Sequence, residues 1–182
     1  MTVATQHPIE RDLDALKDFK VVETRSVTHD GTPAILVRRE RADGVSAGLG
    51  GEHVSTLVAD DGRLLGVTHM RADLAGLPTV SRERAAEVAE EFLLRHAPDL
   101  MDAREVLWID AHPETVRVEG GETQVTGMKV KQRDTRTGLY FWVIVGGDGS
   151  VVTFERDIYW ITFPGKRRTE KWLHDSWRVA GG

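Results

Sequence analysis

Three charged residues stand side by side in the stretch VTFERDIYW, whose other residues are those of a buried strand. Because successive side chains of a strand point to opposite faces, Arg156 would point inward with the apolar residues, while Glu155 and Asp157 would point outward together. A buried guanidinium without a partner is destabilising by several kcal/mol. Arg156 must therefore turn outward at a β-bulge or meet a carboxylate, which belongs either to the protein or to a ligand.

Aromatic side chains would surround Arg156 if this strand pairs with the preceding segment LYFWVIV. A small anionic molecule or a protein partner would bind at such a cleft. The predicted ligand-binding residues are Arg156, Tyr140, Trp142, Trp160, Glu155 and Asp157. Lys129 and Lys131 would form a charge ladder with the two acids, and exposed pairs of this kind contribute about 0.2–1 kcal/mol each.

Histidines supply the candidates for acid–base chemistry. When the two Asp-Gly turns are aligned, His69 takes the place that Arg156 has in the later hairpin, so both would face one cleft. His174 precedes Asp175, and a histidine held by a carboxylate is a suitable general base near neutral pH. A simpler interpretation is that the tail's tryptophans pack it across a sheet edge, with this His-Asp pair incidental.

Three classes of function therefore stay open. The first is a non-catalytic binding module. The second is a small cofactor-free hydrolase, isomerase or cyclase, in which His69 or His174 is the base and Arg156 holds developing negative charge. The third is a scaffold whose sheet edge or basic tail docks a partner, most simply a second copy of the chain.

The other motifs of the sequence do not predict a catalytic or metal-binding site. GVSAG matches Gly-x-Ser-x-Gly, but Ser46 is followed by the glycine-rich LGGEHV and not by the helix that a nucleophile elbow needs. A flexible connection is the better interpretation. His53 and His69 could approach each other, but no third metal ligand can be named. With no phosphate-binding or dinucleotide motif, the sequence predicts neither a metal nor a cofactor.

Composition narrows the class of protein. Of 182 residues, 40% are hydrophobic and 29% charged, and the net charge of −5 gives no drive towards nucleic acid or an anionic membrane. The chain has no cysteine, and its start, MTVATQHPIERDL, lacks the apolar stretch of a signal peptide. We expect a cytoplasmic protein of bacterial type, which a sheet edge could assemble into a homodimer.

Regular elements must position these residues. SRERAAEVAEEFLLRHAP has an apolar stripe at helical spacing between an N-cap at Ser81 and a stop at Pro98. A shorter helix is predicted to begin at Pro8. Alternating apolar runs predict antiparallel hairpins that turn at Asp30-Gly31, Asp61-Gly62, Gly120-Gly121 and Asp148-Gly149.

The order of these elements repeats along the chain. A helix followed by four strands occurs twice, which predicts an α+β fold of two antiparallel curved sheets, each packed on its own helix and related by internal duplication. The predicted units are residues 1–76, residues 77–163 and an extension, 164–182. The extension contains tryptophans and has five basic against two acidic residues. A solvated tail is a better interpretation of it than a phosphate site.

VSRERAAEVAEEFL, followed by strands and then by VADDGRLLGV or VGGDGSVV, resembles the PepSY-type unit of peptidase propeptides and sporulation proteins. More broadly it resembles the cystatin-like arrangement of a helix on a curved sheet. The resemblance covers most of the chain as two copies. Members of that family are typically exported, and the resemblance supplies no set of catalytic residues.

Overall fold

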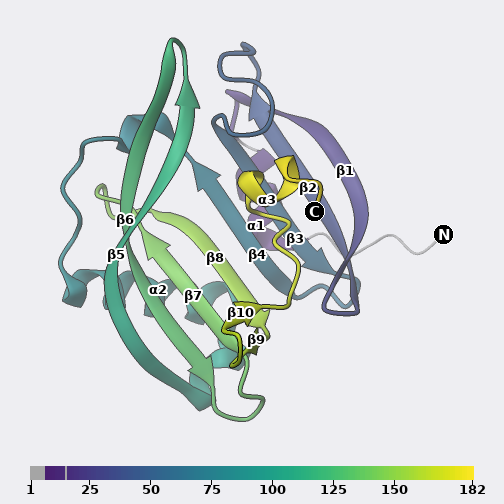
Figure 1. The fold of residues 1–182 in the computed structure, drawn as a ribbon, viewed down its shortest axis with the longest axis vertical. Helices are drawn as coiled ribbons and strands as arrows, with labels where there is room; N and C mark the ends of the chain where they lie inside the picture. Colours follow the sequence, from purple (N-terminus) through teal and green to yellow (C-terminus); the bar gives the residue numbers. More distant parts are fainter. Residues whose placement is uncertain (1–6, 15) are drawn as a thin grey trace.

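The computed structural model describes residues 7–14 and 16–182, so the start of the first predicted unit, residues 1–6, lies outside the described residues (Figure 1). Eight strands form one antiparallel sheet in the order β1-β2-β3-β4-β8-β7-β6-β5. The strands are β1 (Phe19–His29), β2 (Thr32–Arg41), β3 (His53–Ala59), β4 (Leu64–Met70), β5 (Arg104–Val118), β6 (Gly121–Asp134), β7 (Tyr140–Val145) and β8 (Val151–Ile158).

The long predicted helix is confirmed. α2 (Arg82–His96) begins after Ser81, whose side chain accepts a hydrogen bond from the backbone N–H of Arg84. The short α1 (Pro8–Asp14) also begins where predicted. Both helices pack on one face of the sheet, called the helix face below, because Ile9 of α1 and Leu93 of α2 belong to the same buried cluster. Figure 1 shows α2 behind β6 and β7. Two 3-10 helices, η1 (Ala72–Leu74) and η2 (Pro98–Ala103), flank α2.

The expected α+β fold of two sheets, each wrapped around its own helix, is wrong. Strand makes up 47% of the structure and helix 20%, and the described strands β1 to β8 belong to a single sheet. The two meanders, β1–β4 and β5–β8, join where β4 pairs with β8, with Gly66 opposite Glu155 and Thr68 opposite Thr153. Pairing in this way removes two exposed strand edges. The alternation of apolar residues identifies a strand but does not identify its partner, so the sequence could not distinguish one sheet from two.

The predicted hairpins are confirmed. The consecutive strands β1–β2, β3–β4, β5–β6 and β7–β8 pair antiparallel across the expected turns. β5 runs without a break through Pro113. It lies at the edge of the sheet, where a residue that cannot donate a ladder hydrogen bond is tolerated.

Residues 164–182 cross the other face of the sheet, called the tail face below, and Figure 1 shows them in front of the strands. This tail includes β10 (Lys166–Arg167), which pairs with β9 (Trp160–Ile161), and ends in α3 (Asp175–Val179). Leu173 is buried against the sheet at Gly66, where a Cβ atom would lie 2.5 Å from Leu173 Cδ1. Trp172 Nε1 donates to Thr28 O at 2.7 Å. The tail is therefore a packed part of the fold.

A β-bulge interrupts β8 at the charged stretch. The pairing with β7 is regular from Thr153 to Glu155 and resumes at Ile158, so Arg156 and Asp157 together oppose Phe141. Asp157 has a φ of 57°, a left-handed conformation that suits such a bulge. As a result, Glu155 and Ile158 share the tail face while Arg156 points to the helix face, and the simple alternation that we expected is broken.

Candidate functional site

Arg156 has its partners within the protein. It is 4% exposed, and its Nη1 and Nη2 donate to the two carboxylate oxygens of Asp99 at 2.9 and 2.6 Å. Burial lowers the pKa of Arg156, but its hydrogen bonds with Asp99 and the charge of Asp157 outweigh burial and raise that pKa. Asp157 also accepts from Arg63 at 3.2 Å. The expected internal carboxylate is therefore present, whereas the bulge does not turn Arg156 outward. Arg156 lies on the opposite face from the pocket described below.

Glu155 lies on the tail face and is 2% exposed. Its carboxylate accepts hydrogen bonds from Arg167 Nη2 at 2.8 Å, His174 Nε2 at 2.8 Å and Trp142 Nε1 at 3.1 Å. Burial alone would raise the pKa of Glu155, but the charges of His174 and Arg167 hold it well below its usual range. The expected solvated ladder of Glu155 with Asp157 is wrong, because the bulge separates the two acids and the tail buries Glu155.

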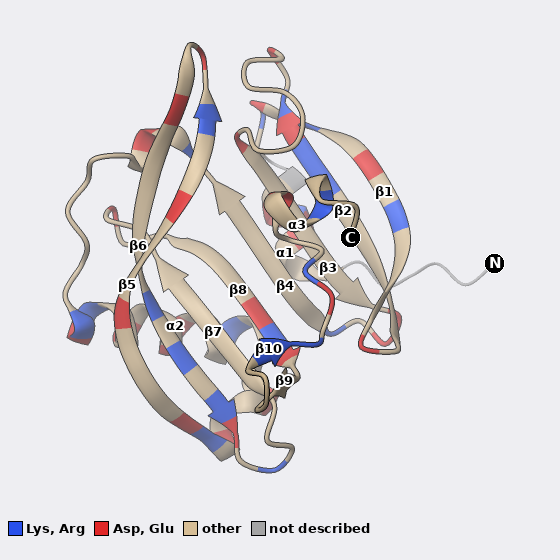
Figure 2. Ribbon diagram, viewed as in Figure 1, with Lys and Arg blue, Asp and Glu red and all other residues tan. Residues whose placement is uncertain are grey.

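Two lysines of β6 lie among the predicted aromatic ligand residues, and Figure 2 shows the basic positions along that strand. Lys129 Nζ is 4.0 Å from the ring centroid of Trp142. Lys131 Nζ is 4.8 Å from the ring of Tyr140 and 5.1 Å from that of Trp160. The three predicted rings therefore gather on the tail face, but around the lysines and not around Arg156.

His69 does not share a cleft with the other candidates. Thr68 and Met70, its neighbours in β4, line the tail-face pocket, so His69 points to the helix face, where its ring packs edge-on against Phe19 at 5.6 Å. Burial and the charge of Arg71 lower the pKa of His69 to about 4. His53 and His69 consequently lie on opposite faces. Among residues 7–14 and 16–182, no cluster of potential ligands could hold a metal ion.

A pocket of about 690 Å³ opens on the tail face. Its walls come from β3 and β4, the loop before β3, the far half of the β5–β6 hairpin, and the tail around α3. Figure 1 shows the hairpin and the loop on either side of α3. A volume of several hundred Å³ suits a small molecule. The residues that line it include Leu49, Gly50, His53, Thr68, Met70, His112, Pro113, Glu114, Arg117, Glu122, Leu173, His174, Asp175, Ser176 and Val179.

His53 forms part of this wall and is 4% exposed. Its Nδ1 lies 2.8 Å from Gly51 O and 3.5 Å from Asp175 Oδ2. Nδ1 therefore carries the ring hydrogen and donates a hydrogen bond to the carbonyl oxygen of Gly51. Burial lowers the pKa of His53 although Asp175 opposes this, and Arg38 lowers it further. Nε2 is then an acceptor, and it is buried without a hydrogen-bond partner in the described part of the chain.

Asp175 connects the tail to the sheet. Its two carboxylate oxygens accept from Arg38 Nη1 and Nη2 at 2.7 and 3.0 Å, and Oδ2 also accepts from the backbone N–H of Gly50 at 2.6 Å. His174 instead donates to Glu155. The predicted partnership of His174 with Asp175 is therefore replaced by two separate contacts, and both residues line the pocket.

Sequence reasoning missed the roles of His53 and Arg38. One signal was present: the run RRE at residues 38–40 puts charges into an alternating strand, as ERD does in β8. Arg38 and Glu40 are indeed buried and bonded to each other at 2.8 Å. Ser46 lies in the loop before β3 and donates to Glu52 at 3.5 Å. A strand follows that loop, so the nucleophile-elbow geometry is not formed.

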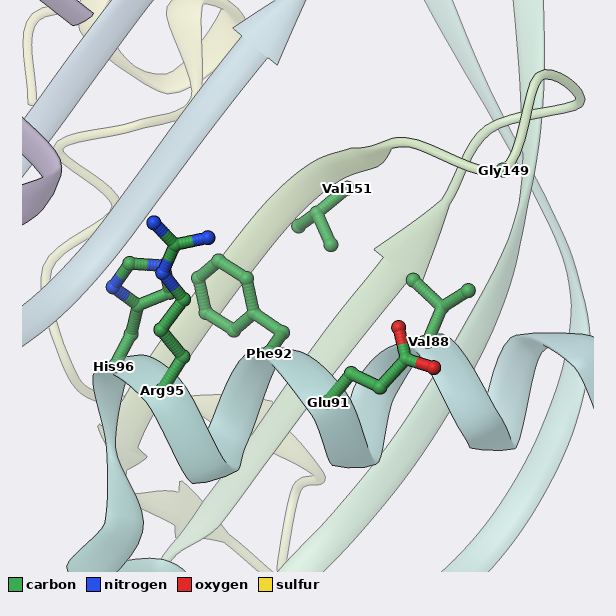
Figure 3. Close-up of a pocket in the computed structure, with 7 residues that line it drawn as sticks. All are labelled: Val88, Glu91, Phe92, Arg95, His96, Gly149 and Val151. Carbon is green, nitrogen blue, oxygen red and sulfur yellow. The ribbon is translucent and has the colours of Figure 1, made fainter. Parts of the chain in front are cut away.

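A second hollow, of about 200 Å³, lies beside α2 (Figure 3). It is lined by side chains of α2, among them Phe92, Arg95 and His96, and by Gly149 and Val151 from the end of the sheet. Figure 3 shows Arg95 and Glu91 at its rim. It is smaller than the tail-face pocket and shallow.

No family model, curated protein or solved structure gives a significant match to the chain. The resemblance to the PepSY-type unit therefore stays a prediction. In the described part of the chain, no helix has the length and apolar character needed to cross a membrane.

Proposed function

We propose that this protein is a non-catalytic binding module that holds a small molecule in the tail-face pocket. The observation that carries the proposal is a cavity of about 690 Å³ whose lining joins apolar side chains to a few polar groups. One of these groups is His53, whose buried Nε2 has no partner among the described residues, and a ligand donor that reaches this atom would satisfy it.

The chemistry of the lining favours a ligand with an apolar body and hydroxyl or amino donors. Apolar contact is available from Met70, Pro113, Leu173 and Val179. An anion, which the sequence suggested, suits this pocket less well. The guanidinium of Arg117 already donates to Ala47 O and Leu49 O, whereas the lining also contains carboxylates. These are Glu114, Glu122 and Asp175.

Binding is a better proposal than base catalysis. A catalytic dyad needs a carboxylate that stabilises the protonated imidazole. Asp175 lies 3.5 Å from His53 Nδ1, but its charge is already balanced by the two-pronged hydrogen bond from Arg38. Asp175 therefore stabilises the protonated form of His53 only weakly. The other expected bases do not help. His69 faces away, and the charge of Glu155, the carboxylate that holds His174, is already balanced by Arg167.

The experiment is a thermal-shift screen of uncharged, cationic and anionic metabolites against the wild-type protein and two tryptophan variants. Ser176→Trp adds bulk to the exposed side of α3 that lines the pocket, and Leu94→Trp adds the same bulk on α2, where Leu94 is 56% exposed. A ligand present at 100 times its Kd should stabilise the wild type and Leu94→Trp by about 2.7 kcal/mol. The same ligand should leave Ser176→Trp unshifted.

His53→Phe then tests the assigned acceptor, and for a hydroxyl or amine ligand it should weaken binding by about tenfold. If no compound stabilises the wild type, or if Ser176→Trp responds as fully as Leu94→Trp, the proposal is wrong. A cytoplasmic location and a homodimer also stay predictions, which cell fractionation and sedimentation would test.

A further inference from the structure

Lys129 has unusual surroundings for a lysine of a strand. Its ammonium lies 4.0 Å from the ring centroid of Trp142 and 5.9 Å from that of Trp108. Among the described residues no carboxylate lies within 4.0 Å of Lys129 Nζ. Glu155 is the acid with the largest electrostatic effect on Lys129, and it is occupied by Arg167, His174 and Trp142. Lys129 is thus a partly buried amine held by aromatic rings without an ion pair.

Further positive charge surrounds this amine. Lys131 lies two residues along β6 on the same face, roughly 6–7 Å away along the strand, and Arg167 lies 5.6 Å from the ring of Trp142. Burial is the main cause that lowers the pKa of Lys129, to about 8, and Lys131 lowers it further while Glu155 opposes the change. A lysine that is desolvated and beside another cation is the kind that acts as an amine nucleophile at neutral pH.

We propose that Lys129 is a covalent capture site for small oxo acids, with the carbonyl carbon on Lys129 and the carboxylate directed to Lys131. The unprotonated amine adds to the carbonyl to give a carbinolamine, and proton transfer followed by loss of water gives an imine. No oxidant or reductant takes part, and hydrolysis returns both reactants. This site is separate from the pocket of His53, because Lys129 is not among the residues that line it.

The test uses the wild-type protein with pyruvate and sodium cyanoborohydride, which reduces any imine to a stable secondary amine, and quantifies each lysine by peptide mass spectrometry. Lys166 of β10, which is exposed, is the reference within the same chain. Lys129 should be modified at least about tenfold faster than Lys166 near pH 7, because its lowered pKa leaves a reactive fraction of the amine unprotonated. The rate at Lys129 should rise with pH and level off above about pH 8.

Methyl pyruvate tests the carboxylate contact. In Lys131→Gln the rate at Lys129 should fall several-fold more with pyruvate than with this uncharged ester. If Lys129 reacts no faster than Lys166, the capture site is wrong. If the two reagents lose rate equally in Lys131→Gln, the assignment to oxo acids is wrong. Ser176→Trp should leave these rates unchanged, so failure here is distinguishable from failure of the pocket proposal.

Discussion

Glu155 and Arg156 are neighbours in the chain, both are almost fully buried, and they lie on opposite faces of the same sheet. Arg156, on the helix face, reaches the rim of the apolar core and pairs with Asp99, whose side chain is 48% exposed. Glu155, on the tail face, pairs with Arg167, and both side chains are 3% exposed. One ion pair keeps contact with water and the other does not.

The difference reflects what covers each face. The helix face is sealed by an apolar cluster that includes Leu93, Val143 and Phe154. The tail face is covered by a chain segment that packs Leu173 into a smaller apolar cluster and adds buried polar contacts, with Glu155 and Arg38 of the sheet bonded to His174 and Asp175 of the tail. Apolar packing thus supplies the stability of the helix face, whereas buried charges fix the position of the tail and shape the pocket beside it.

Glu155→Gln should cause the largest loss in the free energy of unfolding, and it tests the buried charges of the tail face. The amide keeps the shape of the side chain but removes the charge, which leaves the buried guanidinium of Arg167 without a counter-ion. Removing one partner of a buried pair is destabilising by about 3–5 kcal/mol. Urea unfolding measures the change, with exposed Glu119→Gln as the control, expected within about 0.5 kcal/mol of the wild type. A loss below about 1 kcal/mol for Glu155→Gln would contradict the role given to this pair.

Acid should act on both faces through buried histidines whose pKa burial lowers, and His69 is the one that tests the helix face. Burial lowers the pKa of His69 on the helix face to about 4 from 6.5, so the unfolded chain binds this proton more tightly than the folded chain. The stabilising contribution is therefore complete above pH 6.5 and is lost as pH falls towards 4, by up to about 3 kcal/mol. On the tail face, the charge of His53 and hydrogen bonds from Arg38 lower the pKa of Asp175 in spite of burial, so its contribution persists above pH 3.8.

The measurement is the free energy of unfolding across this pH range for the wild type and His69→Leu. The variant should lose distinctly less stability than the wild type on acidification. Equal slopes would mean that His69 is not the group that titrates. Indole fluorescence of the tail's Trp172 and Trp177 should stay native-like down to about pH 4, because the lowered pKa of Asp175 keeps its ion pair with Arg38 intact.

Much of the local structure could be predicted from the sequence. The way in which the hairpins join into one sheet could not. The cap at Ser81 and the Asp-Gly turns act within a few residues, so their signals are local. The pairing of β4 with β8 joins residues about 90 positions apart and leaves no local signal. The charged run in β8 correctly marked an irregular place, but its partner Asp99 lies 57 residues away. His53 was missed because its importance depends on a tail that returns across the sheet.

Arg156→Leu should change the free energy of unfolding least, and it tests the ion pair on the helix face. The substitution leaves Asp99 without its partner, but that carboxylate is 48% exposed and can be hydrated, so no buried charge remains. Leucine also suits the apolar helix face. We expect a change in the free energy of unfolding within about 1 kcal/mol, and no change in the response of the pocket to its ligand. A loss as large as that of Glu155→Gln would show that the two faces depend on buried charge to the same degree. If ligand binding were lost instead, the guanidinium would have to act through the sheet on the tail face.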